Sequence, residues 1–216
     1  MLTSHYYNNN LETKSLEKTF TVNLLGNALT FITDHGVFSK ERVDYGSRVL
    51  IESWIREPWY KKVLEVGCGY GPIGISLAKV HPDIHFDLID VNLRAIDLTK
   101  RNAKLNNVHN VSVFESNIYE NIKDKYDCII SNPPIRAGKV IVHQILEDAF
   151  HHLNENGSLF VVIQKKQGAP SAEKKLEQIF GNVEIVCRDK GYYVLKSCKK
   201  NKINLLTCSK FNDIIV

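Results

Sequence analysis

The chain has few cysteines, and none of them is arranged as a pair. Its 216 residues include five cysteines, and no two of these have the spacing of a metal-binding or redox pair. An odd number of cysteines without a disulfide framework is typical of a reducing compartment. The sequence also lacks the apolar core of a signal peptide and any apolar run long enough to span a bilayer. We therefore expect a cytoplasmic protein that does not enter a membrane.

The chain also lacks a strong charge of either sign and any internal repeat. It has 28 basic and 24 acidic residues, which give a net charge of +4. This balance mildly favours polyanionic partners but does not by itself indicate a nucleic-acid-binding protein. The histidines at 81, 109, 151 and 152 show no metal-ligand spacing, and no Ser-His-Asp pattern emerges. We therefore expect no metal centre.

Strand-like and helix-like segments alternate from residue 62 onward, which predicts a parallel sheet with helical crossovers. The expected strands are Val63–Gly67, His85–Asp90, Val111–Glu115, Tyr126–Ser131, Ser158–Ile163, Val183–Cys187 and Tyr192–Ser197. The expected helices are Gly71–Val80, Asn92–Asn106, Lys139–Leu153 and Ser171–Phe180. Residues 118–125 form a crossover short enough to hold only a turn.

The link between the last two expected strands is Arg188–Gly191, which is short enough to force an antiparallel pair. The predicted fold class is therefore α/β, with a Rossmann-like, seven-stranded, mostly parallel sheet. Helices cover both faces of this sheet, and its last strand is antiparallel. Such a sheet binds its ligand at the carboxyl ends of the strands.

Residues 1–60 do not share this alternation. They contain an apolar-patterned run at Lys18–Leu25 and a helix-like segment at Asp44–Arg56. We expect residues 1–60 to form an N-terminal cap packed on a catalytic domain at 61–198. Residues 199–216 follow the last expected strand and form a C-terminal tail.

A glycine-rich turn follows the first expected strand, and its spacing fits two cofactors. Gly67, Gly69 and Gly71 fit the G-x-G-x-G loop of S-adenosylmethionine enzymes. The set that begins at Gly69 and ends at Gly74 fits the G-x-G-x-x-G fingerprint of dinucleotide-binding proteins. Asp90 ends the next strand and suits a ribose hydroxyl with either cofactor.

Three features favour S-adenosylmethionine. Glu65 lies just before the glycines, where a carboxylate suits a cationic amino group and repels a pyrophosphate. Pro72 removes a backbone N–H from the anion-binding end of the following helix. The turn after residue 131 has no role in hydride transfer. We therefore expect methyl transfer, with S-adenosylhomocysteine as the product, rather than NAD chemistry.

That turn is Asn132-Pro133-Pro134-Ile135, and it directly follows an apolar, β-branched strand. Two consecutive prolines continue neither a strand nor a helix, so the chain turns stiffly at the edge of the sheet. The side-chain oxygen of Asn132 and the carbonyl of Pro133 can both accept hydrogen bonds from a flat amino group. After the third strand, Asn117 is in position to bind the adenine amino group, where many such enzymes have Asp.

Together these motifs resemble a class I S-adenosylmethionine-dependent methyltransferase of the Asn-Pro-Pro type. More narrowly, Asn132–Lys139, Gln164–Ala169 and Gly191–Tyr193 resemble the small-subunit (16S) ribosomal RNA guanine-N2 methyltransferase family in its short single-domain form. The likeness runs from about His5 to Ser197. The duplicated N-terminal domain of the long form is absent from this sequence, and the segment after Ser197 has no counterpart.

The resemblance implies a role for each matching residue. The loop around the methionine end of the cofactor would consist of Glu65, Gly67, Cys68, Gly69 and Gly71. The ribose and adenine would lie against Asp90, Asn117 and Ile118. The target base would be held by the catalytic turn Asn132, Pro133, Pro134 and Ile135, of which Asn132 also borders the cofactor. The aromatic residue often found at the last of these positions is replaced by Ile135.

The resemblance implies methylation of the exocyclic N2 of a guanine, which must be flipped out of a helix or already unpaired. Positive side chains flank the proposed cleft and suit RNA phosphates, namely Arg136, Lys139, Lys165 and Lys166. The expected partner is ribosomal RNA or the small ribosomal subunit, and the protein would act as a monomer or homodimer.

Two other functions remain open from the residues alone. The first is methylation of another planar nitrogen, either an adenine amino group in nucleic acid or a glutamine amide in a release factor. The second is a catalytically silent module that binds nucleic acid. The intact glycine loop and Asn132-Pro133-Pro134 turn argue against the silent module.

Overall fold

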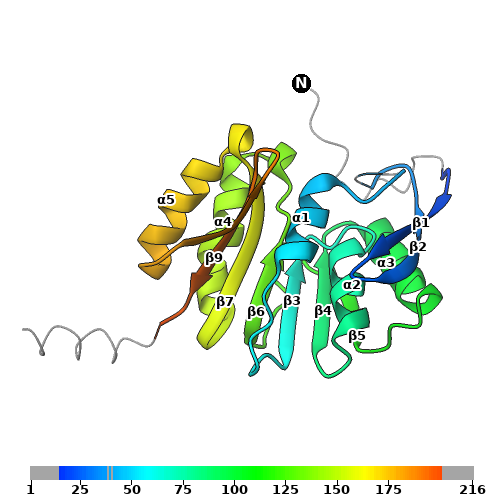
Figure 1. Ribbon diagram of the computed structural model, residues 1–216, viewed down its shortest axis with the longest axis horizontal. Helices are drawn as coiled ribbons and strands as arrows, with labels where there is room; N and C mark the ends of the chain where they lie inside the picture. The colour runs from blue at the N-terminus through cyan, green and yellow to red at the C-terminus, as the bar shows by residue number, and fades with distance from the viewer. Residues whose placement is uncertain (1–14, 38, 40, 201–216) are drawn as a thin grey trace, which may run out of the picture.

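The computed structural model describes residues 15–37, 39 and 41–200 (Figure 1). Almost all of the predicted C-terminal tail lies outside the described residues, and so does Cys208. None of the described helices is long and apolar enough to cross a membrane.

Seven strands of the described residues form one sheet in the order β5-β4-β3-β6-β7-β9-β8. They are β3 (Lys62–Val66), β4 (His85–Asp90), β5 (Val111–Glu115), β6 (Tyr126–Ser131), β7 (Leu153–Gln164), β8 (Glu184–Asp189) and β9 (Tyr192–Cys198). Neighbours from β5 to β7 are parallel, whereas β9 is antiparallel to both β7 and β8. The predicted Rossmann-like sheet with its antiparallel last strand is confirmed.

In the described part of the chain, five helices cover the sheet, and two short 3₁₀ turns follow β6 and β7. Their bounds are α1 (Tyr45–Ser53), α2 (Pro72–Val80), α3 (Leu93–Leu105), η1 (Ile135–Ala137), α4 (Lys139–His152), η2 (Lys165–Gln167) and α5 (Ala169–Phe180). Apolar side chains of α1, α2 and α3 pack on one face of the sheet, and those of α4 and α5 pack on the other. The crossover at residues 116–125 contains turns and no helix, as predicted.

Strand β7 begins at Leu153 rather than at the expected Ser158. Asn156 and Gly157 lie inside this strand, at a bulge where the register with β6 shifts. Asn156 has a φ of +65°, and a Cβ on Gly157 would lie 2.8 Å from the carbonyl oxygen of Asn154. These two residues therefore have the geometry of a turn, and strand pairing continues on both sides of the bulge that they form.

Side chains of β3 alternate between the two faces of the sheet. Val63 belongs to the core under α1 to α3, whereas Leu64 and Val66 belong to the core under α4 and α5. Glu65 therefore faces α2, in a position that the alternation reserves for an apolar residue. It is only 1% exposed.

The N-terminal segment packs on the sheet through a hairpin and a helix. Strands β1 (Lys18–Leu24) and β2 (Asn27–Thr33) form an antiparallel hairpin, which lies beside α3 in Figure 1. The side-chain amides of Asn102 in α3 and of Asn106, which caps the C-terminus of α3, each exchange hydrogen bonds with the backbone of β2. Helix α1 ends at Ser53, earlier than expected, and contacts β7 and β9. The division into cap, catalytic domain and tail stays a prediction.

Candidate active site

The loops after β3 and β6 leave the sheet side by side. Val66 of β3 pairs with Ser131 of β6, so Gly67 and Asn132 begin their loops at the same level. Strand β4 lies on the other side of β3, and the chain therefore reverses its strand order between β3 and β6. Open α/β sheets bind ligands at such a switch point.

Backbone hydrogen bonds hold the glycine loop against the end of β4. The N–H groups of Gly67 and Cys68 both donate to the carbonyl of Ile89, at 2.9 Å. Gly67 and Gly69 have φ values of +78° and +59°, which glycine adopts without strain. Gly71 has a φ of +90°, and a Cβ there would lie 2.7 Å from Cδ1 of Ile75. The loop conformation therefore requires these glycines.

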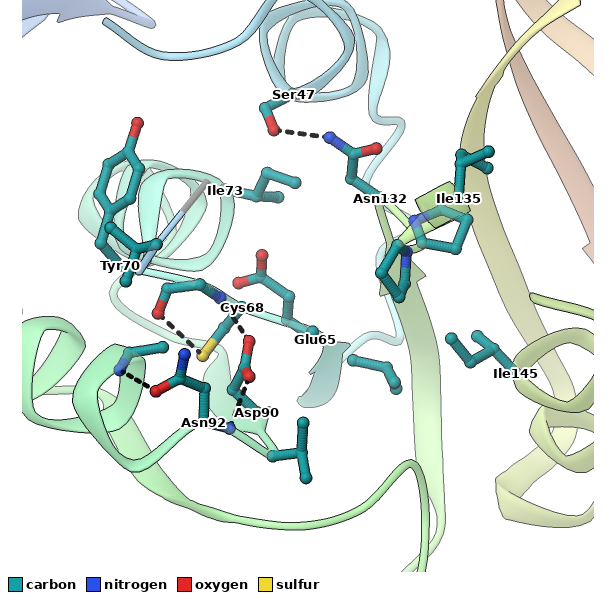
Figure 2. A pocket seen from close by; sticks show the side chains of 18 of the residues that line it. Ser47, Glu65, Cys68, Tyr70, Ile73, Asp90, Asn92, Asn132, Ile135 and Ile145 are labelled. Carbon is teal, nitrogen blue, oxygen red and sulfur yellow. Dashed lines mark hydrogen bonds between the residues drawn. The ribbon is translucent and has the colours of Figure 1, made fainter. Parts of the chain in front are cut away.

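The carboxylate of Glu65 has one satisfied oxygen and one unsatisfied oxygen. Oε2 accepts a hydrogen bond from the backbone N–H of Gly74, whereas Oε1 has no partner among the described residues. Burial raises the pKa of this carboxyl to about 8; the Gly74 N–H opposes the rise and the charge of Asp90 adds to it. In Figure 2 the carboxylate reaches into the space between Cys68 and Ile73. A buried oxygen without a partner is costly, so this position suits a ligand that donates a hydrogen bond and carries positive charge.

Asp90 closes the other side of the glycine loop. Its Oδ2 accepts from the N–H of Gly69 and its Oδ1 from the N–H of Asn92, both at 2.9 Å. Burial raises the pKa of the Asp90 carboxyl against the opposing effect of these N–H groups. A carboxylate has about four acceptor sites, so Asp90 keeps room to accept from a hydroxyl-bearing ligand.

A loop of the N-terminal segment reaches the same cavity. The Nδ2 of Asn92 donates to the carbonyl of Gly36 at 3.3 Å, and Arg94 donates to the carbonyl of His35 at 2.6 Å. Gly36 and Val37 thereby join the cavity lining.

Asn132 has its amide nitrogen bound and its amide oxygen available. Nδ2 lies 3.2 Å and 3.4 Å from the two carboxylate oxygens of Asp44 and 3.0 Å from the hydroxyl of Ser47. A carboxylate accepts hydrogen bonds and cannot donate them, which identifies the end of the amide that faces Asp44 as the NH₂ group. Oδ1 points away from Ser47, on the side of Ile135 (Figure 2), and no described residue donates to it.

The two prolines differ in their hydrogen bonds. The carbonyl of Pro134 accepts from the N–H of Ala137 at 2.9 Å and so closes the η1 turn. The carbonyl of Pro133 accepts no hydrogen bond from the described residues. The Asn132 side chain and the Pro133 backbone therefore supply two acceptors on neighbouring residues.

An apolar wall lies opposite the glycine loop. Ile118, Ile135 and Ile141 pack against the core under α4 and α5, and all three line the cavity. Beside them, Asn117 donates from Nδ2 to Glu120 at 2.8 Å, which leaves its Oδ1 able to accept. A flat ring with an amino group at its edge fits this combination.

These groups line one cavity of about 290 Å³, close to the lower limit for small-molecule sites. The predicted cofactor and catalytic residues that line it are Glu65, Gly67, Cys68, Gly69, Asp90, Asn117, Ile118, Asn132, Pro133, Pro134 and Ile135. Gly71 does not line it, because it caps α2 behind the loop.

The four predicted phosphate-binding residues are exposed but do not share one position. Arg136 lines the cavity mouth. Lys139 begins α4, and Lys165 and Lys166 lie in η2. Turn η2 is joined to the β8–β9 link, because the N–H of Lys165 donates to the carbonyl of Gly191 at 2.7 Å. The residues therefore flank the mouth from two elements.

The structure adds to the site several residues for which no role was predicted, although Tyr192 lies within the Gly191–Tyr193 motif. Asp44 and Ser47 begin α1, and Tyr192 begins β9, yet all three line the same cavity as Asn132. Asp44 was recognisable only as the start of a helix, because an Asp N-cap carries no sign of a distant partner. Among the described residues, no group of three or more His, Cys, Asp or Glu side chains is arranged to hold a metal ion.

Comparison with known proteins agrees with this geometry. The family model "Methyltransferase small domain" matches residues 28–196. A protein of Bacillus subtilis named "Uncharacterized protein YbxB" is 46% identical over 200 residues, which cover 92% of this chain and all of that protein. "Ribosomal RNA small subunit methyltransferase C" of Photorhabdus laumondii is 33% identical over 169 residues, 76% of this chain. The match covers only 48% of that longer protein.

Solved structures share the fold. The chain superposes with a TM-score of 0.75 on a Thermus thermophilus 16S rRNA N2 G1207 methyltransferase in complex with AdoMet and guanosine. The identity is 25%, over 87% of this chain and 52% of that one. A methyltransferase from Pyrococcus furiosus superposes with a TM-score of 0.65 at 22% identity, covering 77% of this chain and 91% of that one. The chain therefore belongs to the methyltransferase small domain family, within the class I S-adenosylmethionine-dependent methyltransferases.

Proposed function

We propose that the protein methylates the exocyclic N2 of a guanine in small-subunit ribosomal RNA, with S-adenosylmethionine as the methyl donor. The observation that carries the proposal is the pair of acceptors at Asn132 Oδ1 and the Pro133 carbonyl, beside a cavity that suits a cationic ligand. Curated relatives named for small-subunit rRNA methylation support it, although this chain spans about half of their length.

The cofactor residues divide by the chemistry of each part of S-adenosylmethionine. Oε1 of Glu65 suits the amino group, and the backbone of Gly67 to Gly69 lets the methionine end approach closely. Asp90 suits the ribose hydroxyls, and Asn117 with Ile118 suits the adenine. When bound, the cofactor supplies an electrophilic methyl group on a sulfonium, so the protein needs no metal to activate it.

The target amine determines what the protein must contribute. The lone pair of a guanine amino group is delocalised into the ring, which makes the nitrogen a poor nucleophile. Acceptors at Asn132 Oδ1 and the Pro133 carbonyl would bind its two hydrogens and favour a pyramidal nitrogen with its lone pair aimed at the methyl group. The same acceptors would stabilise the positive charge that the nitrogen carries after transfer.

The target base also needs a surface on which to lie. Among the described residues that line the cavity, aromatic rings come only from Tyr70 and Tyr192. Tyr70 is 2% exposed and is covered by the rings of Phe20 and Phe31. Tyr192 is half-buried and sits beside α1, where a Cβ on Gly46 would lie 2.9 Å from its ring. Tyr192 is thus the ring available for stacking, in place of the aromatic residue that Ile135 replaces.

The surroundings of the mouth fit an RNA substrate. Arg136, Lys139 and the η2 lysines would bind phosphates on either side of an extruded nucleotide. The N-terminal segment would act as a cap, because its Gly36–Val37 loop and α1 border the cofactor and base ends of one cavity. A catalytically silent module would have no use for the oriented amide of Asn132.

The test is transfer of a labelled methyl group from S-adenosylmethionine to unmodified small ribosomal subunits, followed by analysis of the nucleosides. The expected product is labelled N2-methylguanosine. Label in methyladenosine would keep the methyltransferase and discard the guanine. Absence of label in RNA, with transfer to the glutamine of a release-factor peptide, would discard the RNA substrate as well.

A further inference from the structure

The first turn of α1 is bonded to the catalytic turn. Asp44 is the N-cap of α1, and its Oδ1 accepts the N–H of Ser47 at 3.1 Å. The same Oδ1 also accepts a hydrogen bond from Nδ2 of Asn132. The hydroxyl of Ser47 accepts a second hydrogen bond from this Nδ2. One carboxylate oxygen therefore caps the helix and fixes the amide.

We propose that Asp44 and Ser47 are positioning residues that fix the orientation of the Asn132 amide for methyl transfer. The inference rests on the proposed role of Asn132 as an acceptor. An unrestrained amide can rotate by half a turn and present NH₂ where the substrate needs an oxygen. Both of its neighbours here accept from Nδ2, so rotation would place Oδ1 against a carboxylate at a cost in electrostatic repulsion.

The position of Asp44 gives the device a further consequence. Asp44 lies 88 residues before Asn132, in the N-terminal segment rather than in the sheet that carries the glycine loop. None of the hydrogen bonds between described residues joins Asp44 or Ser47 to the glycine loop. Substitution of Asp44 or Ser47 should therefore lower the rate of methyl transfer without weakening cofactor binding. This result would distinguish the two residues from those that bind the cofactor.

The first variant separates positioning from helix capping. Asp44→Ser keeps a good N-cap but is too short to reach the amide of Asn132. It should reduce the single-turnover rate about tenfold or more, because small misplacements at a reacting centre have such effects. The dissociation constant for S-adenosylmethionine should stay within about threefold of wild type, because Asp44 makes no hydrogen bond to the glycine loop, Glu65 or Asp90 among the described residues. The melting temperature should remain close to that of wild type.

The second variant set exchanges the two groups. Asn132→Asp places two carboxylates within hydrogen-bonding distance, and their repulsion should turn the acid at position 132 away. Adding Asp44→Asn lets the amide at position 44 donate to the carboxylate at position 132, while the other carboxylate oxygen takes the place of Oδ1. The double variant should be about fivefold faster or more than Asn132→Asp alone, as expected for one restored hydrogen bond.

A matched control lies at the amino ends of β6 and β7, away from the cavity. Nδ2 of Asn154 donates to Oδ1 of Asp127 at 2.8 Å, and that carboxylate also accepts backbone N–H groups of Lys61 and Lys62. Exchange of this pair, Asp127→Asn with Asn154→Asp, should alter stability and leave the transfer rate per folded molecule unchanged. If the control lost as much of the transfer rate as Asp44→Ser, the effect of Asp44→Ser would be explained by lower stability, and the proposal would be overturned.

The experiment separates this proposal from the proposed function. Rates are measured on whichever acceptor the wild-type protein methylates. If that acceptor is not guanine, the proposed substrate is wrong, but the positioning role of Asp44 and Ser47 is still tested. NMR adds a readout that needs no turnover: the Asn132 side-chain NH₂ should exchange with water about tenfold faster in Asp44→Ser than in wild type. Three results would each overturn the proposal. They are an unchanged rate of hydrogen exchange at the Asn132 NH₂ in Asp44→Ser, a wild-type rate of methyl transfer in Asp44→Ser, and a double variant that transfers methyl groups no faster than Asn132→Asp alone.

Discussion

The carboxylate of Glu65 accepts a hydrogen bond of 2.8 Å from the backbone N–H of Gly74, in the first turn of α2. The two groups come this close because Gly74 has no side chain. A Cβ there would lie 2.5 Å from Oε2 of Glu65 and 2.2 Å from Cδ2 of Leu88. The contact fixes one oxygen and leaves Oε1 for a ligand.

Gly74→Ala should therefore damage both the core and the cofactor site. Overpacking of this kind costs about 1–3 kcal/mol of unfolding free energy. Displacement of the Glu65 carboxylate should weaken S-adenosylmethionine binding about tenfold or more, because a charge-assisted hydrogen bond is lost. Thermal unfolding and calorimetric titration measure the two effects.

The control for this variant is Gly181→Ala. Gly181 ends α5 with a φ of +67°, and a Cβ there meets nothing within 4 Å. Its substitution should lower stability by about 1 kcal/mol through backbone strain. Cofactor affinity should not change. An equal loss of affinity in both variants would contradict the role given to Gly74.

Glu65→Gln should remove the pH dependence of cofactor binding. Burial raises the pKa of Glu65 to about 8, and a cationic amino group beside it would lower that pKa. Binding then releases a proton, so affinity should rise with pH up to about 8 in wild type. The variant should bind weakly and show a flat profile below that pH. Titration in buffers of different ionisation enthalpy measures the proton release directly, and a steep profile in the variant would contradict this assignment.

The same pKa predicts how stability changes with pH in the absence of cofactor. The folded-state pKa of Glu65 is raised from 4.5 to about 8, so the folded protein holds a proton that the unfolded chain releases. Between these two values the unfolded state binds fewer protons, and the contribution of Glu65 to stability falls as pH rises. Melting temperatures of Glu65→Gln should therefore exceed those of wild type by more at pH 8 than at pH 5. A constant difference would contradict the raised pKa.

Asn132→Ala should abolish methyl transfer while cofactor affinity stays within about threefold of wild type, since the loss falls on the transition state alone. The variant removes Oδ1 and leaves Glu65, Asp90 and the glycine loop intact. Single-turnover kinetics and calorimetric titration report the two quantities separately. Unchanged turnover would remove Asn132 from the mechanism.

Lys165→Ala with Lys166→Ala should weaken RNA binding and reduce its salt dependence. Loss of two phosphate contacts on single-stranded RNA lowers the slope of log affinity against log salt by about 1.4. The matched control, Lys123→Ala with Lys125→Ala, makes the same change of charge on exposed residues. These two lysines lie just before the amino end of β6, whereas the cavity lies at its carboxyl end. Filter binding at several salt concentrations compares them. Equal slopes in the two variants would mean that the η2 lysines contribute only general surface charge and do not contact RNA phosphates.

The sequence predicted the parts of the molecule that depend on local chemistry. The mostly parallel sheet with its antiparallel last strand, the glycine loop and the Asn132-Pro133-Pro134 turn follow from alternation, link length, glycine spacing and proline stiffness, all within short windows. The same local reading placed β7 five residues late, from Leu153 to Ser158, because a bulge and a strand end look alike in sequence.

The missing parts of the site depend on contacts between distant segments. Asp44 reaches Asn132 across 88 residues, and Tyr192 meets Gly46 only because β9 inserts between β7 and β8. The unpartnered Oε1 of Glu65 likewise becomes visible only once α2 covers the face of β3. These relationships arise from packing, and a single sequence does not contain them.

The most direct test offers all candidate acceptors to the wild-type protein in one reaction. Unmodified small ribosomal subunits, adenine-containing DNA and a release-factor peptide are incubated with labelled S-adenosylmethionine, and each product is separated and hydrolysed. The account predicts label in N2-methylguanosine from the subunits and its loss with Asn132→Ala. Label confined to methyladenosine or to the peptide, or N2-methylguanosine that persists with Asn132→Ala, would contradict it.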